Sequence, residues 1–270
     1  AELSFQNIRA LTAVLELKAN FKSYAAEALA WCIENEWDVV GVVTDNHQES
    51  SPTASLARKY GLRLFDYDSL LNEIEHGDLC FDLAVSYVYW KILRKPLIQS
   101  PKLGILNFHP APLPDLRGTG GFNLAILENH KSFGVTVHYM DEGIDTGPII
   151  EVDRFPINAQ TLTTQSLEKL SHKRMLNLFR RTLERVKKDG VLPSKRMTGG
   201  RHLSRKEMEE LKQIQPGDNV DNKIRAFWFP PYDGANIEID GKRYTVINRS
   251  ILEDLDGDSE AIFRHTQIGS

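Results

Sequence analysis

Asn107 and His109 are the residues of this chain whose types and spacing most clearly predict chemistry. They follow an apolar run, residues 103–106, that predicts a buried strand. Side chains two positions apart on an extended chain point to the same side, so an amide and an imidazole are presented together where this strand ends. In an open α/β sheet, ligands bind at the carboxyl ends of the strands. A site at the end of this strand is therefore predicted.

A carboxylate follows the next predicted strand, residues 135–140. The turn-rich loop after that strand contains Asp145. If the two strands are neighbours, the loop brings this carboxylate to the edge of the sheet that carries Asn107 and His109. The alternative is that Asn107 caps a turn and His109 is an ordinary loop residue; three polar groups at predicted strand ends favour the site.

An amide, an imidazole and a carboxylate together predict acyl-type transfer. The amide can donate to an oxygen that gains negative charge, and the imidazole can move a proton near neutral pH. The carboxylate can fix the tautomer of the imidazole and raise its basicity. No Ser or Cys stands beside His109 in the sequence as a nucleophile, which argues against a covalent intermediate and for direct transfer between two bound substrates.

The remaining pattern predicts alternating strands and helices, which is typical of βαβ units and a mostly parallel sheet. Residues 9–18 have helical propensity. Further strands are expected at 38–45, 62–65, 82–86 and 149–155, and helices at 24–36, 51–60, 69–75, 122–129 and 161–188. Ser23 is expected to cap the first of these helices. In the tail we expect helices at 208–214 and 220–227 and a β-hairpin over 235–247, turned at Asp240-Gly241.

Two segments carry a family resemblance. N-F-H-P-A-P-L-P-D-L-R-G (107–118) and G-V-T-V-H-Y-M-D-E-G-I-D-T-G-P-I-I (134–150) resemble the formyltransferases that use 10-formyltetrahydrofolate. That family includes glycinamide ribonucleotide, methionyl-tRNA and nucleotide-sugar formyltransferases. The resemblance is specific over 82–155 and looser over 12–190. The segment from P-A-P-L-P through R-G-T-G-G-F-N is most similar to the sugar N-formyltransferases.

The resemblance implies an α/β fold with a Rossmann-like, mostly parallel sheet flanked by helices, and a strand rather than a helix at residues 9–18. It divides the chain into a catalytic domain, 1–193, and a small C-terminal subdomain of helix plus β-hairpin, 194–270. It also assigns catalysis to Asn107, His109 and Asp145. Asn107 and a protonated His109 would stabilise an oxyanion while Asp145 holds the imidazole.

The implied reaction moves the formyl group of 10-formyltetrahydrofolate to the amine of a nucleotide-linked amino-dideoxy sugar, for surface polysaccharide synthesis. Folate would be held, largely through backbone groups, by Tyr87, Trp90, Ile92, Leu93, Asp141, Gly143 and Ile144. The sugar substrate would contact Lys22, Ser23, Arg117, Gly118, Trp228 and Tyr232. For Lys22 and Ser23 the reason is also physical, because helix N-termini favour anions, although a solvated lysine and a cap explain them equally well. Arg117 precedes a glycine-rich stretch that allows close approach to a ligand. The aromatic residues 227–229 could instead form the core of the tail or contact a second subunit.

Other interpretations of the function stay open. Glycinamide ribonucleotide and methionyl-tRNA are alternative acceptors, and water would make the chain a hydrolase. A folate or nucleotide-sugar binding module is the non-enzymatic alternative, although binding alone needs no proton-transfer group. Residues 201–270 contain 10 Lys and Arg against 13 Asp and Glu, which makes the tail a poor partner for tRNA.

Composition sets the remaining expectations. The chain has 270 residues, 41% of them hydrophobic, and a formal net charge of −4, which argues against general nucleic-acid binding. Cys32 and Cys80 are expected to be buried thiols in a reducing compartment, and no run is apolar enough for a membrane span, so the cytoplasm is the expected location. His130, His138 and His172 are too scattered to predict a metal site. An exposed hairpin preceded by aromatic residues suggests a homodimer.

Overall fold

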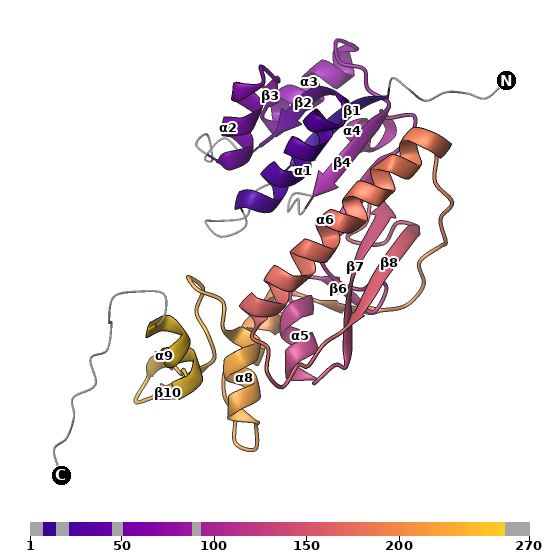
Figure 1. The fold of residues 1–270 in the computed structure, drawn as a ribbon. Coiled ribbons are helices and arrows are strands. Elements are labelled where there is room, and N and C mark those ends of the chain that lie inside the picture. Colours follow the sequence, from indigo (N-terminus) through magenta and orange to yellow (C-terminus); the bar gives the residue numbers. More distant parts are fainter. Residues whose placement is uncertain (1–7, 15–21, 45–50, 88–92, 257–270) are drawn as a thin grey trace.

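A seven-stranded sheet forms the centre of the protein (Figure 1). The computed structural model describes residues 8–14, 22–44, 51–87 and 93–256. The strand order is β3-β2-β1-β4-β5-β7-β8. The strands are β1 (Arg9–Val14), β2 (Asp38–Val43), β3 (Leu64–Phe65), β4 (Leu83–Tyr87), β5 (Ile105–His109), β7 (Ser132–Tyr139) and β8 (Ile149–Pro156). The first five run parallel to their neighbours, whereas β7 is antiparallel to both β5 and β8.

Two hydrophobic cores cover the two faces of this sheet. One face packs against α1 (Lys22–Glu34), α2 (Pro52–Lys59) and the long α6 (Thr164–Asp189). The other packs against α3 (Tyr67–His76) and α4 (Lys95–Gln99). Strand β4 serves both cores, because Val85 faces the first and Ala84 the second, as the period-two alternation of a strand requires. The predicted Rossmann-like sheet is confirmed.

The tail packs on α5 (Gly121–Leu127) through α8 (Val220–Phe227). The Ala226 carbonyl accepts hydrogen bonds from Asn123 Nδ2 at 2.7 Å and Thr164 Oγ1 at 2.5 Å, which fixes α8 to both α5 and α6. The tail also contains α7 (Arg205–Leu211), the predicted hairpin β10 (Asn236–Ile239) and β11 (Lys242–Thr245), and α9 (Arg249–Asp256). Asp240 and Gly241 both have positive φ, as a two-residue hairpin turn needs.

Residues 9–14 form a strand, as the family resemblance implies, and pairing with β2 and β4 on both sides overrides the helical propensity of this segment. Other expectations need correction. Helix α1 begins at Lys22, which places Ser23 inside its first turn instead of at the cap. The segment around Arg117, before the glycine-rich stretch, contains a short strand, β6 (Leu116–Gly118), paired in parallel with β9 (Arg201–Leu203). Cys32 is buried as expected, whereas Cys80 is exposed.

No helix among the described residues is both long enough and apolar enough to cross a bilayer.

Candidate functional site

Strand pairing places three of the polar side chains. Strand β5 carries Asn107 and His109, and in the antiparallel ladder with β7 these residues lie opposite His138 and Thr136. Asn107 and His109 are each 8% exposed and His138 is 2% exposed. The end of β5 is thus a buried polar cluster that retains slight access to solvent.

Asp145 reaches this cluster by a route that the sequence does not reveal. Because β7 is antiparallel to β5, its last residue pairs with Leu106, and the following loop must fold back to approach His109. Two backbone features make that loop tight. Asp145 has φ 50°, and a Cβ at Gly147 would lie 1.9 Å from the Tyr139 carbonyl oxygen.

The Asp145 carboxylate joins the two histidines to a neighbouring strand. Its Oδ1 lies 3.5 Å from His109 Nδ1 and 3.8 Å from His138 Nε2. Its Oδ2 accepts a 2.9 Å hydrogen bond from the backbone N–H of Gly118 in β6. Strand β6 also supplies the Leu116 carbonyl oxygen, 3.3 Å from His109 Nε2. The short strand β6 therefore contacts both His109 and Asp145 through its backbone.

Burial and charge act in opposite directions on the two groups that can titrate. Burial lowers the pKa of His109, and the nearby Asp145 carboxylate opposes that shift without cancelling it. Burial alone would raise the pKa of Asp145, but the nearby His109 and the Gly118 N–H hold it well below its usual range. At neutral pH these shifts favour an ionised Asp145 beside a neutral imidazole in the ligand-free protein. The protonated His109 implied by the family resemblance concerns the oxyanion stage of the reaction and stays a prediction.

His138 is the member of the cluster that sequence reasoning missed, because it was grouped with the scattered histidines. Its Nε2 lies 2.9 Å from Asn107 Nδ2. The available signal was the alternation of the β7 strand, which places Thr136 and His138 on one side, but the partner strand and its register had to be known as well. Within the described ranges no group of three His, Cys, Asp or Glu side chains has the arrangement of a metal site.

The residues expected to hold folate are only partly described. Trp90 and Ile92 lie outside the described residues. Tyr87 is fully buried, with its ring centroid 5.9 Å from Phe108, so its side chain belongs to the core. Leu93 is also buried, at 3% exposure.

In the loop after β7, Asp141 makes a structural turn. Its Oδ1 accepts from the Gly143 N–H and the Thr146 hydroxyl at 3.0 and 2.5 Å. Ile144, beside Asp145, is 50% exposed. A large apolar side chain thus lies at the surface next to the cluster.

The residues expected to contact the acceptor do not form one group. The side chains of Lys22 and Ser23 lie outside the described residues. Arg117 is partly buried in β6, and its Nε has no hydrogen-bond partner among the described residues. Gly118 uses its N–H to hold Asp145.

The two aromatic residues expected at the acceptor lie in the tail. Trp228 packs against the core and accepts a hydrogen bond from the N–H of Gln165 through its carbonyl. Tyr232 is 42% exposed and stacks on Phe229, with 5.7 Å between ring centroids.

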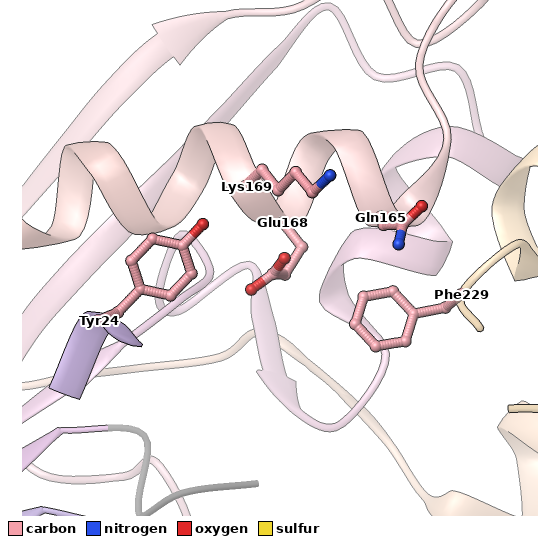
Figure 2. A pocket seen from close by; sticks show the side chains of 5 residues that line it. All are labelled: Tyr24, Gln165, Glu168, Lys169 and Phe229. Atoms are coloured by element: carbon pink, nitrogen blue, oxygen red, sulfur yellow. The ribbon is translucent and has the colours of Figure 1, made fainter. Parts of the chain in front are cut away.

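A pocket of about 240 Å³ lies where the start of α1, the start of α6 and the segment after α8 meet. Tyr24, Gln165, Glu168, Lys169 and Phe229 line it (Figure 2). Figure 2 shows the Glu168 carboxylate between the rings of Tyr24 and Phe229.

Glu168 is 4% exposed, and its Oε1 lies 2.9 Å from Nε2 of His172. The ring of His172 stacks on Tyr24, with 4.5 Å between centroids. The pocket therefore has a buried carboxylate between two aromatic side chains. Of its lining residues, only Phe229 belongs to a segment whose aromatic side chains were considered as contacts for the acceptor.

Comparison with known proteins decides the family. A family model described as formyl transferase matches residues 14–183. The chain belongs to the formyl transferase family.

Curated relatives of this chain include methionyl-tRNA formyltransferases. Methionyl-tRNA formyltransferase from Parvibaculum lavamentivorans is 31% identical over 199 residues, which cover 71% of this chain and 63% of the relative. The chain thus spans under two thirds of that relative's length. Methionyl-tRNA formyltransferase from Latilactobacillus sakei is 25% identical, with 85% of this chain and 76% of the relative covered.

Solved structures share the fold. A 4-N formyltransferase from Francisella tularensis has a TM-score of 0.74 at 18% identity, with 89% of this chain and 97% of that chain covered. The N-formyltransferase from Helicobacter canadensis, solved with folinic acid and dTDP-3-aminofucose, has a TM-score of 0.68 at 20% identity, with 87% and 85% covered. At these identities the similarity establishes the fold of a formyltransferase.

Proposed function

We propose that this formyltransferase moves the formyl group of 10-formyltetrahydrofolate to the amine of a nucleotide-linked amino-dideoxy sugar. The observation that carries the proposal is the buried cluster of Asn107, a neutral His109 and an ionised Asp145. The Ser86 hydroxyl in this cluster donates to Asn107 Oδ1 at 2.8 Å and not to His109, so it is not activated as a nucleophile. The attacking atom then belongs to the acceptor.

Each residue has a role in this proposal. The amine nitrogen of the acceptor forms a bond to the formyl carbon, and the bond from that carbon to N10 of the folate breaks. Asn107 donates a hydrogen bond to the formyl oxygen as it gains negative charge. The neutral His109 takes the proton that the amine loses, which passes to the departing nitrogen. Asp145 orients the imidazole and stabilises its positive charge while it holds the proton.

The residues of the loop after β7 fit a folate. Ile144 offers an exposed apolar side chain next to Asp145, which suits the face of a flat ring. The turn that Asp141 makes leaves backbone groups of this loop at the surface, beside the cluster. The formyl donor supplies an activated one-carbon group, and this loop would hold it against Asn107 and His109.

The pocket at the start of α6 is our proposed site for the acceptor. Helix α1 begins beyond the carboxyl end of β1, so its first turn, which contains Tyr24, lies at the same edge of the sheet as the end of β5. A carboxylate and an amide can accept and donate hydrogen bonds to sugar hydroxyls, and aromatic rings cover apolar ring faces. Lys169, exposed at the rim, offers a positive charge to phosphate.

The test is formyl transfer from 10-formyltetrahydrofolate to a panel of nucleotide-linked 3- and 4-amino-dideoxy sugars. Glycinamide ribonucleotide, methionyl-tRNA and a reaction without acceptor complete the panel. We expect turnover with one amino sugar. We also expect Phe229→Ala and Glu168→Gln to raise KM for that sugar at least about tenfold, while KM for the folate stays the same. Turnover without acceptor, or with no sugar, would contradict the proposal.

Methionyl-tRNA is the second candidate acceptor, because the curated relatives bear the name methionyl-tRNA formyltransferase. The excess of acidic over basic residues in 201–270 argues against it. Turnover with methionyl-tRNA that falls steeply between 50 and 200 mM salt, as expected for phosphate contacts, would favour this candidate.

A further inference from the structure

The Asn107 carboxamide is held at both of its ends. Its Oδ1 accepts from the Ser86 hydroxyl at 2.8 Å, and its Nδ2 donates to His138 Nε2 at 2.9 Å. The first contact alone does not fix the amide, since a serine hydroxyl can donate to an oxygen or accept from an N–H. The second contact must therefore decide which way the amide points.

His138 can fix the orientation of the carboxamide because its own tautomer is set by a backbone hydrogen bond. Its Nδ1 lies 2.8 Å from the Tyr139 carbonyl oxygen, which can only accept, so Nδ1 carries the proton. In the neutral ring Nε2 is then an acceptor, and only the NH₂ side of the carboxamide can face it. A flipped amide would place Oδ1 against the Nε2 lone pair. The second N–H of Asn107 has no partner among the described residues and stays available to a ligand.

We propose that His138 is a positioning residue that locks the orientation of the Asn107 carboxamide, so that an N–H, and not the oxygen, is presented to the formyl oxygen. The inference rests on the proposed function for its catalytic part. The fixed orientation of the Asn107 carboxamide is itself a property of the ligand-free protein. Water is largely excluded from this contact, since His138 is 2% exposed and Ser86 is fully buried, and this strengthens the hydrogen bond between His138 and Asn107.

The contact between His138 and the Asn107 carboxamide is tested first without turnover, by ¹⁵N–¹H correlation spectra of the imidazole rings. We expect wild-type His138 to be protonated at Nδ1 and not at Nε2. In Asn107→Asp the new carboxylate can only accept, so Nε2 should gain a proton. An Nε2-protonated His138 in the wild type, or an unchanged ring in Asn107→Asp, would overturn the inference whatever the acceptor proves to be.

The catalytic part is tested by kinetics with the acceptor that gives turnover. His138→Leu should lower kcat about 10- to 100-fold, less than loss of an oxyanion donor, which costs about 10²–10³. KM values should stay within about threefold. His138→Gln, which retains an acceptor, should recover part of the loss. In an Asn107→Ala background His138→Leu should cost less than about twofold in kcat, because the group that it positions is gone.

A matched control separates positioning from stability. Val135 lies on the same strand and is fully buried in the hydrophobic core, on the strand face opposite Thr136 and His138. Val135→Ala should lower Tm and leave kcat unchanged. Equal losses from His138→Leu with and without Asn107 would overturn the positioning role. If the wild type gave no turnover with any acceptor, the proposed function would be refuted instead. The spectra would still test whether His138 fixes the orientation of the Asn107 carboxamide.

Discussion

Replacing Asp145 by Asn tests the core of the reasoning about the cluster. The substitution keeps the size of the side chain and an oxygen for the Gly118 N–H, but removes the charge 3.5 Å from His109 Nδ1. Two unit charges at that distance interact by about 5 kcal/mol at an effective dielectric constant of about 20, which is an upper limit on the stabilisation of the imidazolium. We therefore expect kcat to fall about 10²- to 10⁴-fold, which corresponds to about 3–5 kcal/mol in the barrier.

The assay is the pH profile of kcat and kcat/KM for formyl transfer. Since the carboxylate raises the pKa of His109, its removal should move the acid limb of kcat/KM to lower pH. Asp115→Asn is the matched control, because the Asp115 carboxylate is exposed and pairs with Arg154. It should leave both parameters unchanged. An Asp145→Asn variant that keeps more than half of the wild-type kcat, or an acid limb that moves to higher pH, would refute the assigned role of Asp145.

Three further predictions concern the scaffold. Gly147→Ala should cost about 2–4 kcal/mol of unfolding free energy and most of the activity, because the new Cβ would lie 1.9 Å from the Tyr139 oxygen; an unchanged Tm would contradict the tight loop. Phe179→Ala should cost about 3–5 kcal/mol in denaturant unfolding because this ring is fully buried, whereas Leu170→Ala on the exposed side of the same helix should cost less than about 1 kcal/mol; similar costs would contradict the packing. Burial lowers the pKa of His109 below its value in the unfolded chain, so its contribution to stability is complete above about pH 6.5 and is lost as the pH falls. The drop in Tm between pH 7 and pH 5 should therefore shrink in His109→Asn, and a steeper drop would refute the direction of this pKa shift.

The elements with strong local signals were predictable. Ser51-Pro52 predicts a helix start, and the structure places Ser51 at the cap and Pro52 at the first helical position. The Asp240-Gly241 turn predicts the hairpin that is present. By contrast, residues 9–14 have helical propensity but form an inner strand, because hydrogen bonding to strands on both sides outweighs a preference of a few tenths of a kcal/mol per residue.

The same division applies to the candidate site. Asn107 and His109 could be recognised because their spacing of two on one strand is a local property, and Asp145 because it lies in a motif. His138 could not be selected, since its meaning comes from a register in which it lies opposite Asn107. The pocket residues Tyr24 and Glu168 are brought together only by the packing of α1 on α6.

The sequence by itself determined the family, the mostly parallel sheet and the three polar residues at its edge, because strand period, turn chemistry and motif spacing are written over a few consecutive positions. Only the tertiary structure decided the charge state and orientation of those residues. Burial lowers the pKa of His109, the returning loop brings Asp145 to it, and the β5–β7 register places His138 against Asn107. Each of these depends on which distant segments exclude water and supply hydrogen-bond partners, and that is a property of packing.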